Sequence, residues 1–147
     1  MLLAMRLEEI MTATVHSIEP DVDIAVAKDR MKRLGIRHLV VMRGPEIVGI
    51  VSDRDLRRSR LTMSDDPWTV RDVMTPQVVV GSPEMTVRRA ATLMRGRVLG
   101  CLPVVDGKRL VGIVTIADLL DLIARGVPGR TPEPKRRDSN GHGAART

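Results

Sequence analysis

Hydrophobic and polar positions follow one order along this chain, and that order occurs twice. Each half begins with a short extended run, at Val15–Ile18 and again at Val78–Val80. Apolar residues at helical spacing come next and predict a helix with one buried face, capped by Asp23 in the first half and by Thr86 in the second. Two β-rich runs and a second helix complete each half. The β-rich runs are Leu39–Met42, Ile47–Val51, Leu102–Val105 and Leu110–Val114.

The two halves align without a gap when the sequence is shifted by 63 positions. Between Ile10–Leu56 and Val73–Leu119, 15 of 47 aligned pairs are identical. Two copies are too few for a solenoid, which generally needs about three or more. We therefore expect an α+β fold in which two pseudo-symmetric β-α-β-β-α units pack face to face through their sheets.

Composition then sets the domain boundaries. We place the first unit at 1–60 with its core at 7–60, a linker at 61–69, the second unit at 70–124 and a basic disordered tail at 125–147. Of the net charge of +6, the tail carries +4, so the folded part is nearly balanced. No apolar run approaches the ~18 residues of a spanning helix. The single cysteine, Cys101, excludes an intrachain disulfide and favours a cytoplasmic location.

One pattern that could carry chemistry occurs in both halves. A hydroxyl residue, Ser52 or Thr115, stands at the end of a strand, and an aspartate, Asp55 or Asp118, follows three residues later in the first turn of a helix. One interpretation is a capping box, in which both side chains satisfy free backbone groups. The other is a nucleotide site, because a helix N-terminus attracts phosphate and a carboxylate can accept ribose hydroxyls. The two roles are compatible.

Several further motifs recur in both halves in the same order. They are Glu9-Ile10-Met11-Thr12 and Asp72-Val73-Met74-Thr75, Pro20 and Pro83 before the helices, Gly35–Val41 and Leu99–Val105, and a closing Gly-x-Val-Ser/Thr-x-x-Asp-Leu pattern. With these motifs the chain resembles a tandem pair of cystathionine-β-synthase-type (CBS) domains, the Bateman module, over roughly Leu7–Ile123. The resemblance implies a regulatory module rather than an enzyme. It also implies an adenosine ligand, most often AMP, ADP or ATP and sometimes S-adenosylmethionine or NAD.

The resemblance also indicates which residues would bind that ligand. Asp55 and Asp118 would hold the ribose, and Ser52 and Thr115 would meet the phosphate. The base would lie in an apolar slot of either half, lined by Thr14, Val15, Ile36, Arg37 and His38, or by Gln77, Val78, Leu99, Gly100 and Cys101.

The two halves differ where phosphate charge would be met. Arg54 and Arg37 stand beside the first aspartate, whereas Ala117 and Gly100 take their places in the second half. We predict that the pocket built on Asp55 binds more tightly, because arginine suits bidentate phosphate contacts. The alternative is that both arginines are solvated surface charges.

Catalytic and metal-ligating patterns do not stand out. His38 and Cys101 occupy equivalent positions, but two ligands are fewer than the roughly three or four that zinc takes from a protein. No Ser-His-Asp or Cys-His arrangement is evident, and no pair of carboxylates has a convincing spacing. We therefore expect neither catalysis nor a resident metal or cofactor.

The preferred interpretation is a freestanding, homodimeric module that senses an adenosine ligand and signals to a partner protein whose identity the sequence does not give. One alternative is a stress-response or scaffold protein that dimerises through its helices without binding nucleotide. Another is weak nucleic-acid binding through Lys135-Arg136-Arg137 in the tail. The absence of Phe and Tyr argues against nucleic acid, because it removes the platforms on which bases stack.

Overall fold

The computed structural model describes residues 2–58 and 68–125, so most of the expected linker and nearly all of the expected tail lie outside it. The elements of the first half are a 3₁₀ turn η1 (Leu2–Ala4), α1 (Leu7–Ile10), β1 (Ser17–Ile18), α2 (Ile24–Leu34), β2 (His38–Arg43), β3 (Glu46–Ser52) and α3 (Asp53–Arg58). Those of the second half are α4 (Val70–Val73), α5 (Val87–Arg97), β4 (Cys101–Asp106), β5 (Arg109–Thr115) and α6 (Ile116–Arg125).

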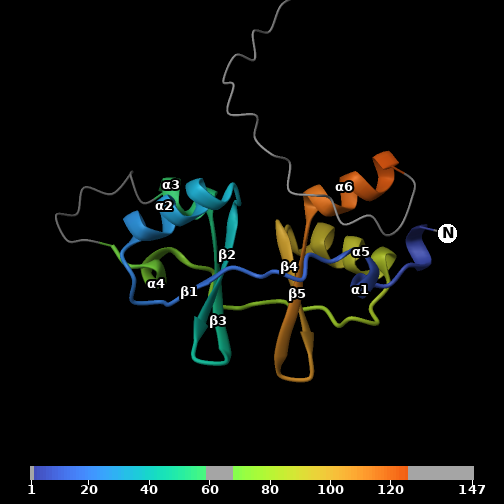
Figure 1. Cartoon of the computed structure of the whole chain (residues 1–147), viewed down its shortest axis with the longest axis horizontal. Helices are drawn as coiled ribbons and strands as arrows, with labels where there is room; N and C mark the ends of the chain where they lie inside the picture. Colours follow the sequence, from blue (N-terminus) through green and yellow to red (C-terminus); the bar gives the residue numbers. More distant parts are fainter. Residues whose placement is uncertain (1, 59–67, 126–147) are drawn as a thin grey trace, which may run out of the picture.

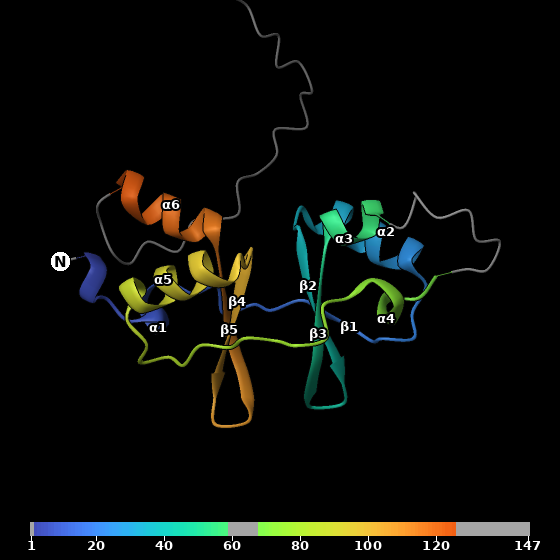
Figure 2. The same cartoon turned by 180° about the vertical axis from the view of Figure 1, so that it is seen from behind.

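Two small sheets occupy the middle of the molecule. In the first sheet β1 runs parallel to β2, and β2 forms an antiparallel hairpin with β3; the second sheet is the antiparallel hairpin of β4 and β5. Figures 1 and 2 show the two hairpins side by side, with α2, α3 and α4 flanking one and α1, α5 and α6 flanking the other. The predicted fold class, two α+β units that meet through their sheets, is confirmed.

The leading strands are shorter than the sequence pattern predicts. Only Ser17–Ile18 of the expected run in the first half forms a strand. In the second half Val78–Val80 forms none, and a single parallel bridge from Gly81 to Val104 replaces it. Gly81 donates to Pro103 and accepts from Val105, which keeps this segment in the position that β1 has in the first unit.

The two long helices begin as predicted but end differently. The Asp23 carboxylate accepts a hydrogen bond from the Ala25 N–H, and the Thr86 hydroxyl accepts one from the Arg89 N–H, so both expected N-caps are confirmed. At the C-terminal end, Gly35 adopts the left-handed region with φ 65°, and its counterpart Val98 does so with φ 54°. Glycine enters this region freely, whereas a β-branched residue is strained there.

Replacing Val98 with glycine should therefore stabilise the protein by about 0.5–1 kcal/mol. The substitution relieves the strain of a left-handed β-branched residue, and the greater entropy of glycine in the unfolded chain offsets part of that gain. Val98 is 87% exposed, so little packing is lost. Urea unfolding measures the change. The matched control is Gly35→Val, whose Cβ would meet nothing within 4 Å and which should be destabilising for conformational reasons. A less stable Val98→Gly variant would contradict this account.

The short helices α1 and α4 are exchanged between the units. Leu7 of α1 is fully buried in the core of the second unit with Val87, Met94 and Leu102, although we assigned it to the first unit by its place in the chain. Its counterpart Val70 of α4 is fully buried in the core of the first unit. Figure 1 shows α1 beside α5 and α4 beside α2. Each unit thus completes its core with a helix from the other half of the sequence.

The segments that lead out of these helices cross between the sheets. Thr12 exchanges two backbone hydrogen bonds with Ile113 of β5, and Thr75 does the same with Ile50 of β3. Glycine allows the close approach, since a Cβ at Gly49 would lie 2.6 Å from the Met74 sulfur, and Gly112 faces Met11 in the same way. These crossings hold the two units together and fix how the predicted site residues face one another.

Candidate functional site

Each predicted hydroxyl and aspartate pair forms a corner between the last strand of its unit and the helix that follows. At the first corner the Ser52 N–H donates to Asp55 Oδ2 (2.9 Å), and the Asp55 N–H donates to Ser52 Oγ (3.1 Å). At the second, the Thr115 N–H donates to Asp118 Oδ2 (2.8 Å), and the Asp118 N–H donates to Thr115 Oγ1 (3.2 Å). Both corners are capping boxes, as the first interpretation predicts.

The capping hydrogen bonds leave one carboxylate oxygen of each corner available to a ligand. All four residues are half-buried, and among the described residues no hydrogen bond reaches Oδ1 of Asp55 or of Asp118. The cap also holds each carboxylate in one orientation, which lowers the entropy that a ligand contact would lose. A pre-positioned carboxylate oxygen beside a hydroxyl at a helix N-terminus can accept hydrogen bonds from vicinal hydroxyls and attract an anion.

The segment before each hairpin is tied to the same corner. His38 lies opposite Ser52 in the register of the first hairpin, and the Asp53 N–H donates to the Arg37 carbonyl. In the second unit Cys101 lies opposite Thr115, and the Ile116 N–H donates to the Gly100 carbonyl. The structure therefore brings the predicted residues 36–38 to the first corner and 99–101 to the second.

The two predicted sites meet at His38 and Gly100. A Cβ at Gly100 would lie 2.6 Å from Nε2 of His38, so the imidazole of the first unit rests on the backbone of the second. Burial lowers the pKa of His38 below its ordinary value, more than the nearby Asp53 and Asp55 carboxylates raise it. The imidazole is therefore mainly neutral near pH 7 and can either donate or accept a hydrogen bond at this boundary.

The remaining predicted site residues are not all gathered at the two corners. Val15 lines a cavity of about 540 Å³ with residues of both hairpin turns, among them Pro45 and Lys108, and does not share a cavity with Ile36 and Arg37. Thr14 and Gln77 are exposed, and Val78 and Leu99 are half-buried. Cys101 is buried, which raises the pKa of its thiol to about 12 and keeps it protonated. Among residues 2–58 and 68–125, no cluster of three or more His, Cys, Asp or Glu could hold a metal ion.

The electrostatic surroundings differ near the two corners. Burial alone would raise the pKa of Asp53, but the hydrogen bond and charge of Arg57, a hydrogen bond from the Arg54 backbone and the charge of Arg37 hold it below its ordinary value. At the second corner, burial raises the pKa of Asp118 despite its hydrogen bonds to Thr115. Cationic groups therefore act on Asp53 beside the first corner, whereas burial has the largest effect on Asp118 at the second.

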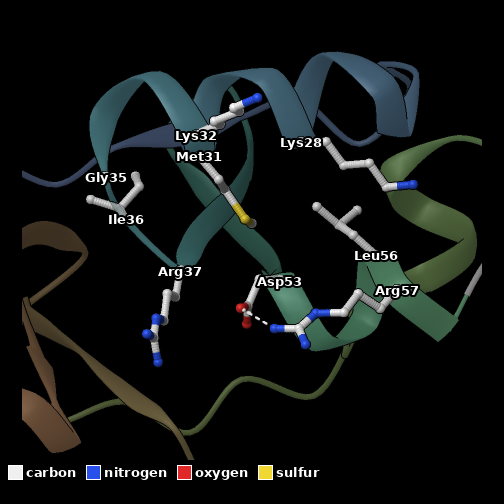
Figure 3. A pocket seen from close by; sticks show the side chains of 9 residues that line it. All are labelled: Lys28, Met31, Lys32, Gly35, Ile36, Arg37, Asp53, Leu56 and Arg57. Carbon is white, nitrogen blue, oxygen red and sulfur yellow. Dashed lines mark hydrogen bonds and ion pairs between the residues drawn. The ribbon is translucent and has the colours of Figure 1, made fainter. Parts of the chain in front are cut away.

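Sequence reasoning found only Ile36 and Arg37 among the residues that line a second cavity, of about 340 Å³, beside the first corner. Figure 3 shows this cavity between α2 and α3, with Lys28 and Lys32 on α2 and Asp53 and Arg57 on α3. Arg57 Nη2 lies 2.8 Å from Asp53 Oδ2. The i,i+4 spacing of Asp53 and Arg57 could have indicated the ion pair, but nothing in the pattern of α2 separates Lys28 and Lys32 from ordinary surface lysines.

The raised pKa of Asp118 predicts a pH-dependent effect of Asp118→Asn. The folded protein holds the Asp118 proton more tightly than the unfolded chain does, so this group contributes its full stability below the unfolded pKa and loses it as pH rises through the folded pKa. Asparagine keeps an oxygen that can accept from the Thr115 N–H. The stability of Asp118→Asn relative to the natural protein should therefore increase from about pH 3 to about pH 7. Urea unfolding across this range would contradict the prediction if the difference stayed constant or fell.

Comparisons with known proteins agree with this architecture. The family model of the CBS domain matches residues 7–62 and again 70–125. The CBS domain-containing protein YhcV of Bacillus subtilis is 32% identical over 113 residues, which cover 76% of this chain and 81% of YhcV. The crystal structure of the CBS-domain containing protein ATU1752 from Agrobacterium tumefaciens has a TM-score of 0.75 at 25% identity, covering 82% of this chain and 99% of that one.

A second similar structure carries ligands. The CBS domain pair of protein MJ0100, crystallised with 5′-methylthioadenosine and S-adenosyl-L-methionine, has a TM-score of 0.77 at 23% identity, covering 84% of this chain and 98% of that one. Within the part of the chain that the structure describes, no helix has both the length and the apolar character that a membrane crossing requires. Two matches to one family model, in a chain whose halves share one fold and exchange their short helices, show that this protein belongs to the CBS domain family and contains a pair of such domains.

Proposed function

We propose that this CBS pair is a regulatory module that binds an adenosine-containing ligand where its two units meet. The observation that carries the proposal is the pair of corners at equivalent positions, each with a carboxylate oxygen left available beside a hydroxyl. In this proposal Asp55 and Asp118 accept the ribose hydroxyls, and Ser52 and Thr115 lie near the phosphate. The His38 contact with Gly100 supports a shared boundary, because residues of both predicted slots meet there.

The choice of ligand class follows from the resemblance to CBS pairs and from the ligands of one neighbour that has the same fold. Methylthioadenosine and S-adenosylmethionine, the ligands of the MJ0100 pair, both contain adenosine. AMP, ADP and ATP are the first candidates for this chain because Arg37 and Arg54 stand beside the first corner and would favour a phosphorylated ligand. S-adenosylmethionine and NAD are the next candidates. Binding would act on a partner protein by favouring one arrangement of the module over another.

A panel of AMP, ADP, ATP, NAD and S-adenosylmethionine tests the proposal through thermal unfolding. A ligand at about 100 times its Kd should stabilise the folded state by about 2.7 kcal/mol. Adenine and ribose 5-phosphate serve as controls that supply the parts of the ligand separately. If no member of the panel raises the unfolding temperature at millimolar concentration, the sensor proposal is wrong.

A second candidate function is a scaffold that associates without nucleotide, and one observation supports its association. The α6 helix exposes a row of large apolar side chains, with Ile116 at 49%, Leu120 at 60% and Ile123 at 70% of full exposure. Contiguous apolar surface of this kind marks interaction sites in folded proteins. We therefore keep a homodimer formed through helices as part of both candidates, and the ligand panel separates them.

A further inference from the structure

The cavity between α2 and α3 is lined mainly by cationic and apolar side chains. Four cationic residues line it, Lys28, Lys32, Arg37 and Arg57, against the single carboxylate of Asp53, which gives a net charge of +3. Met31, Ile36 and Leu56 form its apolar lining. Figure 3 shows the lysines along α2, the two guanidinium groups on the opposite side, and the Met31 sulfur directed between them.

Most of this positive charge has no partner in the fold. The Asp53 carboxylate is bound by Arg57 at 2.8 Å, so that pair is neutral. Among the described residues, no ion pair involves Lys28, Lys32 or Arg37. Three like charges therefore surround one hollow with a low-polarity lining, and their mutual repulsion would be relieved by an anion.

The internal repeat provides a comparison within the same chain. Shifting by 63 positions takes Lys28, Arg37, Asp53 and Arg57 to uncharged residues, Ala91, Gly100, Ile116 and Leu120, while Lys32 becomes Arg95. At these equivalent positions of the second unit only Arg95 is cationic. The CBS fold therefore does not require the cluster, and its presence in one unit points to a ligand.

We propose that this α2–α3 pocket binds the phosphate or diphosphate group of a phosphorylated small molecule, whose non-polar part covers Met31, Ile36 and Leu56. Arginine provides bidentate contacts to phosphate, and the lysines add mobile point charges. A volume of about 340 Å³ lies within the range of small-molecule sites. The pocket adjoins the adenosine site of the proposed function and shares Ile36 and Arg37 with its predicted base slot, but Ser52, Asp55, Thr115 and Asp118 do not line it.

Calorimetric titration with pyrophosphate tests the pocket directly. The variant K28A/K32A should weaken pyrophosphate binding by about tenfold or more, because two charge-assisted contacts are lost. The control R88A/R95A removes the same charge from exposed positions of α5 and should change the affinity by no more than about twofold. Phenyl phosphate should bind more tightly than inorganic phosphate, because its ring would cover the apolar lining.

Three other results would contradict the proposal of an anion site between α2 and α3. Equal weakening by both double variants would mean that pyrophosphate responds to net charge alone, and absence of binding to the natural chain at millimolar pyrophosphate would remove the site. Asp55→Asn separates this proposal from the proposed function. Its amide oxygen can still accept from the Ser52 N–H and cap α3, so it should leave pyrophosphate affinity unchanged while reducing adenosine-ligand affinity. If Asp55→Asn abolishes pyrophosphate binding and K28A/K32A does not, the anion binds at the corner and the α2–α3 pocket is wrong.

Discussion

Replacing Leu7 with alanine should lower the free energy of unfolding by about 2–5 kcal/mol, the usual effect of removing a large side chain from a core. The physical reason is that Leu7 is fully buried among Val87, Met94 and Leu102 of the second unit. The local loss of stability should appear in residues far from Leu7 in sequence. Hydrogen exchange should accelerate in Cys101–Thr115 more than in His38–Ser52, because the second core loses its packing.

Val70→Ala is the matched control for Leu7→Ala. Val70 occupies the equivalent position, is also fully buried and packs in the core of the first unit. Its replacement should have a smaller effect on stability, because fewer atoms are removed, and should accelerate exchange in His38–Ser52 instead. If both variants loosened the hairpin nearest in sequence, the exchange of α1 and α4 would be wrong.

Replacing Asp55 with alanine should reduce the affinity for the adenosine ligand by about tenfold to a hundredfold, the range expected when one or two hydrogen bonds to a charged group are lost. Asp118→Ala should have the smaller effect. Arg37 and Arg54 are sequence neighbours of the first corner, whereas Gly100 and Ala117 stand at their places beside the second, where Asp118 has a raised pKa. Calorimetric titration of the two variants gives the comparison.

Asp55 also caps α3, so a control must separate ligand contact from stability. Asp72 has the same capping role at α4, where its Oδ2 accepts from the Thr69 N–H at 2.8 Å, and it lies outside both corners. Asp72→Ala should lower stability by about 0.5–2 kcal/mol, as loss of a cap does, and leave ligand affinity unchanged. An Asp118→Ala variant that loses more affinity than Asp55→Ala would reverse the ranking of the corners.

The sequence pattern predicts the local parts of this structure well. Helical spacing and capping residues place α2 and α5, with Asp23 and Thr86 at their starts, because these features depend on neighbours within one turn. The 63-residue repeat predicts two similar units, and the Ser/Thr and Asp pattern predicts both capping boxes. Each of these is a short-range regularity that periodicity can detect.

Long-range contacts could not be predicted in the same way. The partners of Leu7 begin about eighty residues later, so its place in the chain assigns it to the wrong core. The predicted leading strand of the second half does not form. Only Gly81 pairs with β4, at Val104, although Val78–Val80 has the composition of a strand. The contact of His38 with Gly100 depends on how the two sheets meet, which repeats and propensities do not encode.

A crystal structure of the protein grown with the most stabilising member of the nucleotide panel would show whether the corners bind the ligand. We expect ribose hydroxyls within hydrogen-bond distance of Asp55, with the ligand bounded by residues 36–38 and its phosphate near Ser52. A nucleotide bound at another place, with Asp55 and Asp118 still serving only as caps, would contradict it.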